Sequence, residues 1–323
     1  MADFPISGAQ NYIQVGRETT YGTGVTCNQP LGHNTSITPS ENMNETPVYG
    51  LGSPYPSKVF AGLFEGKLTI NFDLASTYFM RLVMGTVTDG GAEPFTHTYN
   101  DNTGYAVTSF TLEDGSDLDT DVVEKYLGCV VDSCDMTARV GESTPVVLNC
   151  MYAGDTLANT GLDTTPAADA EDLLIFSEGS WQFPSGTTIA RVQSITLRIL
   201  KNAQLIWGLG SRVATKAIWK QMIFEWDAEI AFENDAMLET LYGQTTGPLT
   251  ATNPARQASF VLTWTNGGAT TALRSLVITL GTSQIVSMEI PKKVGELTIQ
   301  RVKGFSISKT SAVGTDNTAT NPL

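Results

Sequence analysis

Residues 64–73 read FEGKLTINFD, and residues 224–233, which lie 160 positions later, read FEWDAEIAFE. In the first segment apolar Leu68, Ile70 and Phe72 alternate with polar residues. A period of two predicts a β-strand with one buried face. The second segment repeats the first Phe and Glu and the later Ile and Phe at matching positions. Both segments therefore predict a strand that packs on one side only.

A short helix and a glycine are expected after each of these strands. Residues 74–84 place apolar side chains at helical spacing, with Asp73 as the expected N-cap and Gly85 as the stop. The second copy predicts a helix over residues 234–242 that ends at Gly243. A strand, a helix and a glycine that recur in the same order favour duplication of one structural unit over chance identity.

Many further segments read as short strands, which is typical of β-sandwiches and barrels. We expect a mainly β protein built from two fused sandwich or barrel modules, each with one short α-helix. A segment rich in Ala, Thr and Asp marks the boundary between them, and a segment with four prolines reads as a long loop. The expected parts are a first module at 1–153 including the loop at 38–58, a linker at 154–172, a second module at 173–309 and a flexible arm at 310–323.

Composition limits the possible functions. The chain has 323 residues, of which 41% are hydrophobic and 16% charged, so it can bury a large core without metals or disulfides. Its 33 acidic and 19 basic residues give a net charge of −14, which disfavours tight binding of nucleic acid. No apolar run approaches the roughly 18 residues that span a bilayer, and no signal peptide is evident. We expect a soluble chain whose four cysteines are reduced.

The residues needed for catalysis or metal binding are not arranged in known patterns. His33 and His97 are the only histidines, and neither accompanies a nucleophile motif, so His97 reads as a strand residue. Cys129 and Cys134 lack a second pair at zinc-ligand spacing. The acidic run at 113–124 resembles a calcium loop in part, but Val122 replaces the required turn glycine. The sequence predicts no catalytic, cofactor or metal residues.

Taken in order, several segments resemble the tail tube (major tail) proteins of long-tailed bacteriophages. They cover most of the chain from about residue 12 to 309, and none is specific alone. The segments are ETTYGT at 18–23, the strand and helix at 64–85, FTHTY at 95–99, SFTLE at 109–113, YLGCVVDSCDM at 126–136, ARVQSITL at 190–197 and LGSR at 209–212.

The resemblance implies a structural protein of the virion tail, assembled in the host cytoplasm. Its subunits would form rings whose sheets join into one inner barrel, and stacked rings would form a tube that conducts the genome during ejection. A duplicated module favours trimeric rings with pseudo-sixfold symmetry over hexameric rings. The family also implies a tape-measure protein and tail terminator or tip proteins as partners, and DNA that passes without specific binding.

The resemblance assigns roles to two groups of residues. If the polar faces of the two alternating strands line the bore, they form a negative wall that keeps phosphates from adsorbing. The acidic candidates for this face are Glu65, Asp73, Glu225, Asp227, Glu229 and Glu233. The loop at 38–58 would contact the next ring, and its contact candidates are Tyr49, Leu51, Tyr55 and Lys58.

One alternative function uses the aromatic residues. A virion-surface or secreted β-sandwich could bind carbohydrate on exposed tryptophans, although aromatics in β-proteins are more often core residues. The candidate stacking residues are Trp181, Trp207, Trp219, Trp226 and Trp264.

Overall fold

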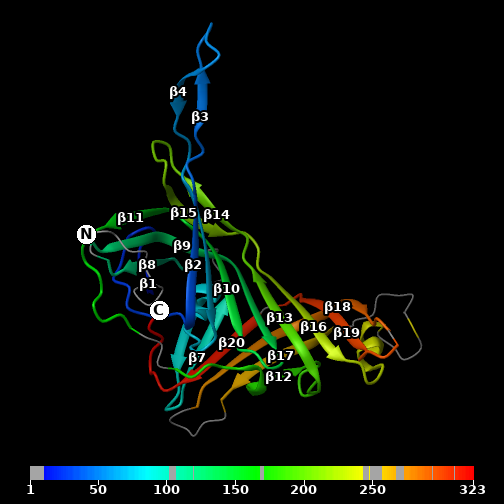
Figure 1. Cartoon of the computed structure of the whole chain (residues 1–323). Coiled ribbons are helices and arrows are strands. Elements are labelled where there is room, and N and C mark those ends of the chain that lie inside the picture. The colour runs from blue at the N-terminus through cyan, green and yellow to red at the C-terminus, as the bar shows by residue number, and fades with distance from the viewer. Residues whose placement is uncertain are drawn as a thin grey trace.

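The computed structural model is mainly β, with 57% of residues in strands and 5% helical, as the sequence predicted. It describes residues 11–101, 107–118, 120–167, 171–242, 247, 257–266, 273–292, 294–308 and 310–323. One antiparallel sheet holds 16 strands, and two hairpins of two strands each stand apart from it (Figure 1). None of the described helices is long and apolar enough to span a bilayer.

The strands are β1 (Asn11–Arg17), β2 (His33–Asn42), β3 (Thr46–Tyr49), β4 (Pro56–Phe60), β5 (Glu65–Asp73), β6 (Gly85–Gly90), β7 (Phe95–Asp101), β8 (Phe110–Ser116), β9 (Val122–Arg139), β10 (Pro145–Tyr152), β11 (Gly154–Ala158), β12 (Gly179–Gln182), β13 (Val192–Leu200), β14 (Ala203–Trp207), β15 (Ala214–Trp219), β16 (Ile223–Ala231), β17 (Gln257–Thr265), β18 (Ser275–Glu289), β19 (Ile299–Ser306) and β20 (Thr310–Asp316). The helices are α1 (Met80–Met84), α2 (Ala236–Tyr242) and the 3-10 turn η2 (Phe176–Glu178).

The two alternating segments form β5 and β16, and each buries one face as predicted. Both strands show nearly the same succession of buried and accessible residues along their nine positions. Leu68, Ile70 and Phe72 of β5 are at most 2% exposed, while Trp226 and Ala228 of β16 are equally buried. The polar residues between them point to the opposite face of the sheet.

The order of strands in the sheet repeats. In the first half β2, β5, β10 and β9 lie side by side, and in the second half β13, β16, β19 and β18 do so in the same connectivity. The flanking strands also correspond, since β1 pairs with β8 as β12 pairs with β17. We call these halves the first and second modules. They join in one continuous sheet because β9 pairs with β13.

A glycine and an aromatic residue exchange places between the modules. In the first module Gly66 on β5 lies opposite Tyr152 on β10, whose ring fills the space that a Cβ on Gly66 would occupy. In the second module Trp226 takes the place of Gly66, and its ring covers Gly304 on β19 in the same way. Each module therefore packs one large ring over one glycine at the same pair of strand positions.

Each helix begins later than predicted. α1 starts at Met80, and Asp73 instead accepts hydrogen bonds from Ser143 and Asn34 at the end of its strand. Asp73 is thus not an N-cap, since residues 74–79 hold no regular helix. Gly85 does end α1, with φ of 112°, a conformation that side chains rarely adopt. Gly243, the expected stop of α2, lies outside the described residues.

The segment at 38–58 is not an irregular loop. β2 runs through its first part, and β3 and β4 form a hairpin that projects far from the body of the molecule (Figure 1). Prolines are tolerated here because β2 lies at the sheet edge and β3 and β4 pair only with each other. In the second module β14 and β15 form the corresponding hairpin at the same end.

Two other expected boundaries differ. Residues 310–316 form β20, which pairs with β18 and β7, and Leu323 beyond it is 1% exposed, so this end is packed rather than a flexible arm. Part of the expected linker at 154–172 forms β11, which pairs with β9. β20 corresponds to β11. In the first module β11 follows β10 and pairs with β9, and in the second module β20 follows β19 and pairs with β18.

Candidate functional site

The accessible face of the sheet carries three of the six acidic residues that the sequence predicts for the wall of a bore. Glu225, Asp227 and Glu229 alternate along β16 and share one face. The strand registers place Arg198 of β13 opposite Glu225, and Lys303 of β19 opposite Asp227. These side chains line an open hollow of about 580 Å³ together with Arg139, Ser194, Thr196, Val286 and Ser287.

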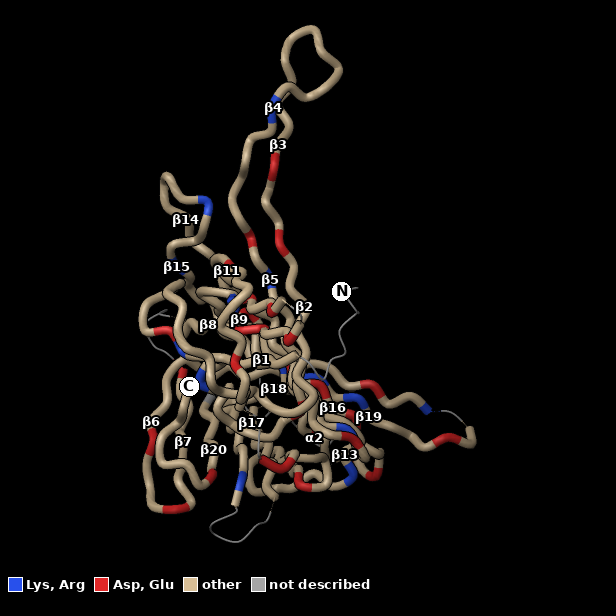
Figure 2. Tube along the Cα trace, turned by 60° about the vertical axis from the view of Figure 1, so that its left-hand side comes forward, with Lys and Arg blue, Asp and Glu red and all other residues tan. Residues whose placement is uncertain are grey.

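This polar face is balanced in charge rather than net negative. Across β9, β13, β16 and β19 this face carries four acidic and four basic residues, and Figure 2 shows both signs in this region. The registers place Arg198, Lys303 and Arg301 opposite the four acidic residues, while Arg139 lies opposite Ser194. Ion pairs join Asp227 to Lys303 at 3.0 Å, Glu229 to Arg301 at 3.0 Å and Asp135 to Arg198 at 2.9 Å. All of these groups are partly exposed, so each pair contributes at most about 1 kcal/mol to stability. The acidic candidates therefore neutralise neighbouring cations.

The other three acidic candidates lie away from this cluster. Glu65 begins β5, and Asp73 ends it in hydrogen bonds with the adjoining loops. Glu233 follows the end of β16 and forms an ion pair with Arg191. The basic partners went unpredicted because they lie on strands distant in sequence, and only the strand order brings them together.

The β3–β4 hairpin exposes an unusual amount of apolar surface. Tyr49 is 61% exposed, Leu51 110% and Tyr55 75%, and Lys58 lies on the neighbouring strand β4. Further exposed apolar residues follow the hairpin toward its base, namely Met43, Val48, Val59 and Phe60. Contiguous apolar surface of this kind marks an interaction site, because a folded chain gains nothing by leaving it in water.

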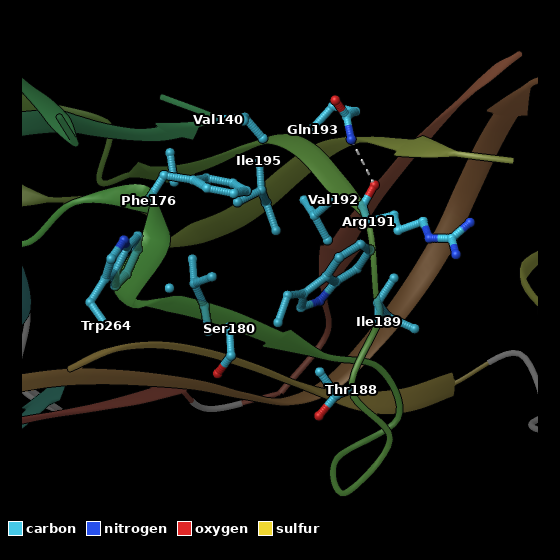
Figure 3. A pocket seen from close by; sticks show the side chains of 14 residues that line it. Val140, Phe176, Ser180, Thr188, Ile189, Arg191, Val192, Gln193, Ile195 and Trp264 are labelled. Carbon is cyan, nitrogen blue, oxygen red and sulfur yellow. Dashed lines mark hydrogen bonds between the residues drawn. The ribbon is translucent and has the colours of Figure 1, made fainter. Parts of the chain in front are cut away.

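An apolar pocket of about 340 Å³ lies where β9 of the first module meets β12 and β13 of the second. Phe176 and Trp264 lie at one end of it and Arg191 and Gln193 at the other (Figure 3). Trp181 and Trp264 line the pocket but are themselves at most 2% exposed. Trp219 and Trp226 are also buried, and Trp207 is partly buried, so the tryptophans do not form the exposed platforms that carbohydrate stacking requires.

Two buried basic side chains connect separate elements of the fold. His97 of β7 lies in a strand as predicted, with Asp89 at 2.7 Å and Asp316 at 3.2 Å from its two ring nitrogens. Burial lowers the pKa of His97, but hydrogen bonds to the two carboxylates outweigh it and leave the pKa above its usual value. Lys201 lies under the Trp219 ring just after the end of β13. The sequence offered no signal for either contact.

Among the described residues, the cysteines and the acidic run do not come together in a group at metal-ligand distance. All four cysteines are free and buried, and burial raises the pKa of Cys134 well above its usual value. Asp119 of the acidic run lies outside the described residues. Glu124, the last residue of the acidic run, lies instead with Glu41 and Asp155, and the carboxylate oxygens of these three residues are within 4.8 Å of one another beside the edge strand β2.

A known protein family matches most of the chain. The family model for phage tail tube protein matches residues 8–319. The chain belongs to this family. It is therefore a structural component of the virion tail, and its family assembles into oligomeric tubes. No curated protein matches the chain.

Proposed function

We propose that this chain forms rings that stack into a tail tube, with the polar sheet face turned toward a bore that conducts double-stranded DNA. The observation that carries the proposal is the two-sided character of the sheet. One face packs on the core, while the other carries hydrophilic residues on neighbouring strands of both modules. Closing such a sheet into a barrel places the polar face inside, where water and DNA can occupy it.

Pairing of the bore's cations explains how DNA could pass without sticking. DNA binds proteins by exchanging its counterions for Lys and Arg side chains, so each available cation adds affinity. Here Lys303, Arg301 and Arg198 each have a carboxylate within 3.0 Å. The acidic residues of this face act by holding these cations away from phosphates.

A charge-reversal variant tests this role. Replacing Asp227, Glu229 and Glu233 by Lys removes three carboxylates and adds three cations per chain. We expect tubes to assemble but genome delivery to fall, because the bore would bind DNA in a salt-dependent manner. As a matched control, Arg301→Gln with Lys303→Gln removes cations from the same face and should preserve delivery. Unchanged infectivity of the triple Lys variant would contradict the proposal.

The β3–β4 hairpin is the proposed contact between stacked rings. Both hairpins project from the same end of the sheet, so a head-to-tail stack would direct them into the neighbouring ring (Figure 1). Replacing residues 49–55 by a short Gly-Ser turn should leave a soluble, folded protein that fails to polymerise. Tubes of normal length from this variant would contradict the role, whereas Ser57→Ala, a small change on β4 beside the turn, should assemble normally.

Rings of three chains agree best with the duplicated modules. Each chain supplies two four-stranded units to the sheet, so three chains supply six units and 24 strands. In this proposal the tube is assembled in the host cytoplasm around a tape-measure protein and ends at terminator and tip proteins. A ring of six chains is the alternative, and a mass measurement of isolated rings distinguishes the two.

A further inference from the structure

Two strand edges at opposite ends of the repeated sheet have no partner strand among the described residues. β2 pairs with β5 on one side only. β18 pairs with β19 up to Glu289, but its pairing with β17, on its other side, stops at Gln284. Among the described residues, no strand pairs with residues 285–289 of β18 on that side. A strand edge without a partner readily pairs with another chain.

The equivalents of these two edges already meet inside the chain. β13 corresponds to β2 and β9 to β18, and the two pair over seven positions, from Ser194↔Arg139 to Leu200↔Ser133. At the centre of this joint Leu197 lies opposite Met136, and both are 0% exposed. The chain thus contains one complete example of the contact that its free edges could make with a second copy.

The repeat fixes which residues would meet. In the second module Leu197 pairs with Trp226. Trp226 lies 160 residues after Gly66 and is its equivalent, and in the first module Gly66 pairs with Glu41. Glu41 is therefore the equivalent of Leu197. Met136 pairs with Val146 on β10, and Val146 pairs with Phe72 on β5. The residue 160 positions after Phe72 is Phe232, which is therefore its equivalent in the second module.

On the second module, Phe232 donates its N–H to Thr298. Continuing the β18–β19 register by three residues from Glu289↔Arg301 places Lys292 opposite Thr298. Lys292 is therefore the equivalent of Met136, and it would meet Glu41 of the neighbouring copy.

The geometry points to a protomer joint in which the end of the β18–β19 hairpin pairs antiparallel with β2 of the next copy, with Lys292 opposite Glu41. The same register places Val294, which is 102% exposed, opposite Pro39, and Ile290 opposite Met43, which is 43% exposed. This inference rests on the proposed ring function and supplies its interface.

Charge supports this register. Glu41 accepts a hydrogen bond from Tyr152 at 2.9 Å and shares a small space with Glu124 and Asp155. Three carboxylates so close together repel one another, and an incoming ammonium group would relieve that repulsion. Lys292 is exposed on the hairpin that the repeat brings to this point. A buried apolar pair at the module joint is thus matched by an opposite-charge pair at the protomer joint.

Disulfide trapping tests the register directly. Residues opposite each other in antiparallel strands have Cβ atoms about 5 Å apart, close enough for a disulfide after small adjustments. In Glu41→Cys with Lys292→Cys, oxidation of assembled tubes should link neighbouring chains. The bond cannot form within one chain, because seven strand spacings of about 4.8 Å separate β2 from β18 along the sheet. Ser36→Cys with Lys292→Cys, displaced by five residues, is the out-of-register control. The four native cysteines are buried.

Charge exchange provides an independent readout. Lys292→Glu should reduce the fraction of protein in tubes by about tenfold, because like charges at an interface are strongly unfavourable. Adding Glu41→Lys should restore assembly, while Lys220→Glu, at another exposed site, should have little effect. Circular dichroism checks that each variant folds.

If wild-type tubes form but the double variant Glu41→Cys with Lys292→Cys gives no covalent oligomers, or the control pair crosslinks as well, the register is wrong while the tube function stands. If the wild-type chain forms no rings or tubes, the proposed function itself fails. Crosslinking specific to the in-register pair, with rescue by charge exchange, supports the joint.

Discussion

Lys201 provides a quantitative test of how the two modules are held together. Its side chain is 0% exposed, and its Nζ lies 4.1 Å from the centre of the Trp219 ring, 3.5 Å from the Met84 carbonyl and 3.7 Å from Asp101. Desolvation by burial lowers the pKa of Lys201 from 10.5 to about 8, and the nearby Asp101 charge offsets only part of this effect. The folded protein therefore holds this cation at a net cost.

The size and sign of the effect follow from this shift. At about 1.36 kcal/mol per pKa unit, the difference between 10.5 and about 8 corresponds to roughly 3 kcal/mol. Because the folded pKa is the lower one, the unfolded chain binds more protons between these two values. Stability should therefore rise with pH across that interval, and the cost is fully present below about pH 8.

Lys201→Met keeps the length of the side chain and removes its charge. We expect the variant to be more stable than wild type at pH 7, by up to about 3 kcal/mol, and the difference to shrink by pH 10. Urea unfolding at both pH values measures it, and Lys216→Met on the exposed face of β15 should change stability by less than about 0.5 kcal/mol. A Lys201→Met variant less stable than wild type, or a difference independent of pH, would show that burying the Lys201 charge does not destabilise the fold.

Two further changes test contacts on which the fold depends. His97→Gln should destabilise the protein by about 2 kcal/mol at pH 5.5 and by less at pH 9, because the His97 pKa is raised in the folded state, so its stabilising charge is present below the unfolded pKa and is lost as pH rises. Thermal unfolding against pH measures this, and equal losses at both pH values would contradict it. Gly304→Tyr should be destabilising because the Trp226 ring occupies the space of its Cβ, and adding Trp226→Gly should recover part of the loss. Additive effects in this double-mutant cycle would exclude the proposed exchange between modules.

The alternating strands and the duplication could be predicted because their causes are local. A strand with one buried face must alternate, and residues 64–73 and 224–233 do so at matching positions. The β3–β4 hairpin was missed because its prolines and glycines are typical of loops, yet an isolated edge hairpin tolerates them.

Contacts between distant strands could not be predicted in this way. Asp227 was correctly placed on the polar face, but its partner Lys303 comes from β19, and nothing near either residue indicates that these strands are neighbours. The net charge of the whole chain, −14, was also a misleading guide to the charge of this one surface. The acidic residues predicted for the bore neutralise cations of the same sheet. Strand order, rather than composition, determines the charge of that face.

We propose above that three chains, each with two equivalent modules, surround a bore lined by the polar sheet face. Electron cryomicroscopy of tubes assembled from the purified chain tests it most directly. We expect rings of three chains with pseudo-sixfold symmetry, 24 strands around the bore, and Asp227 and Lys303 on the inner wall. Six chains per ring, or a ring in which this face points outward, would contradict it.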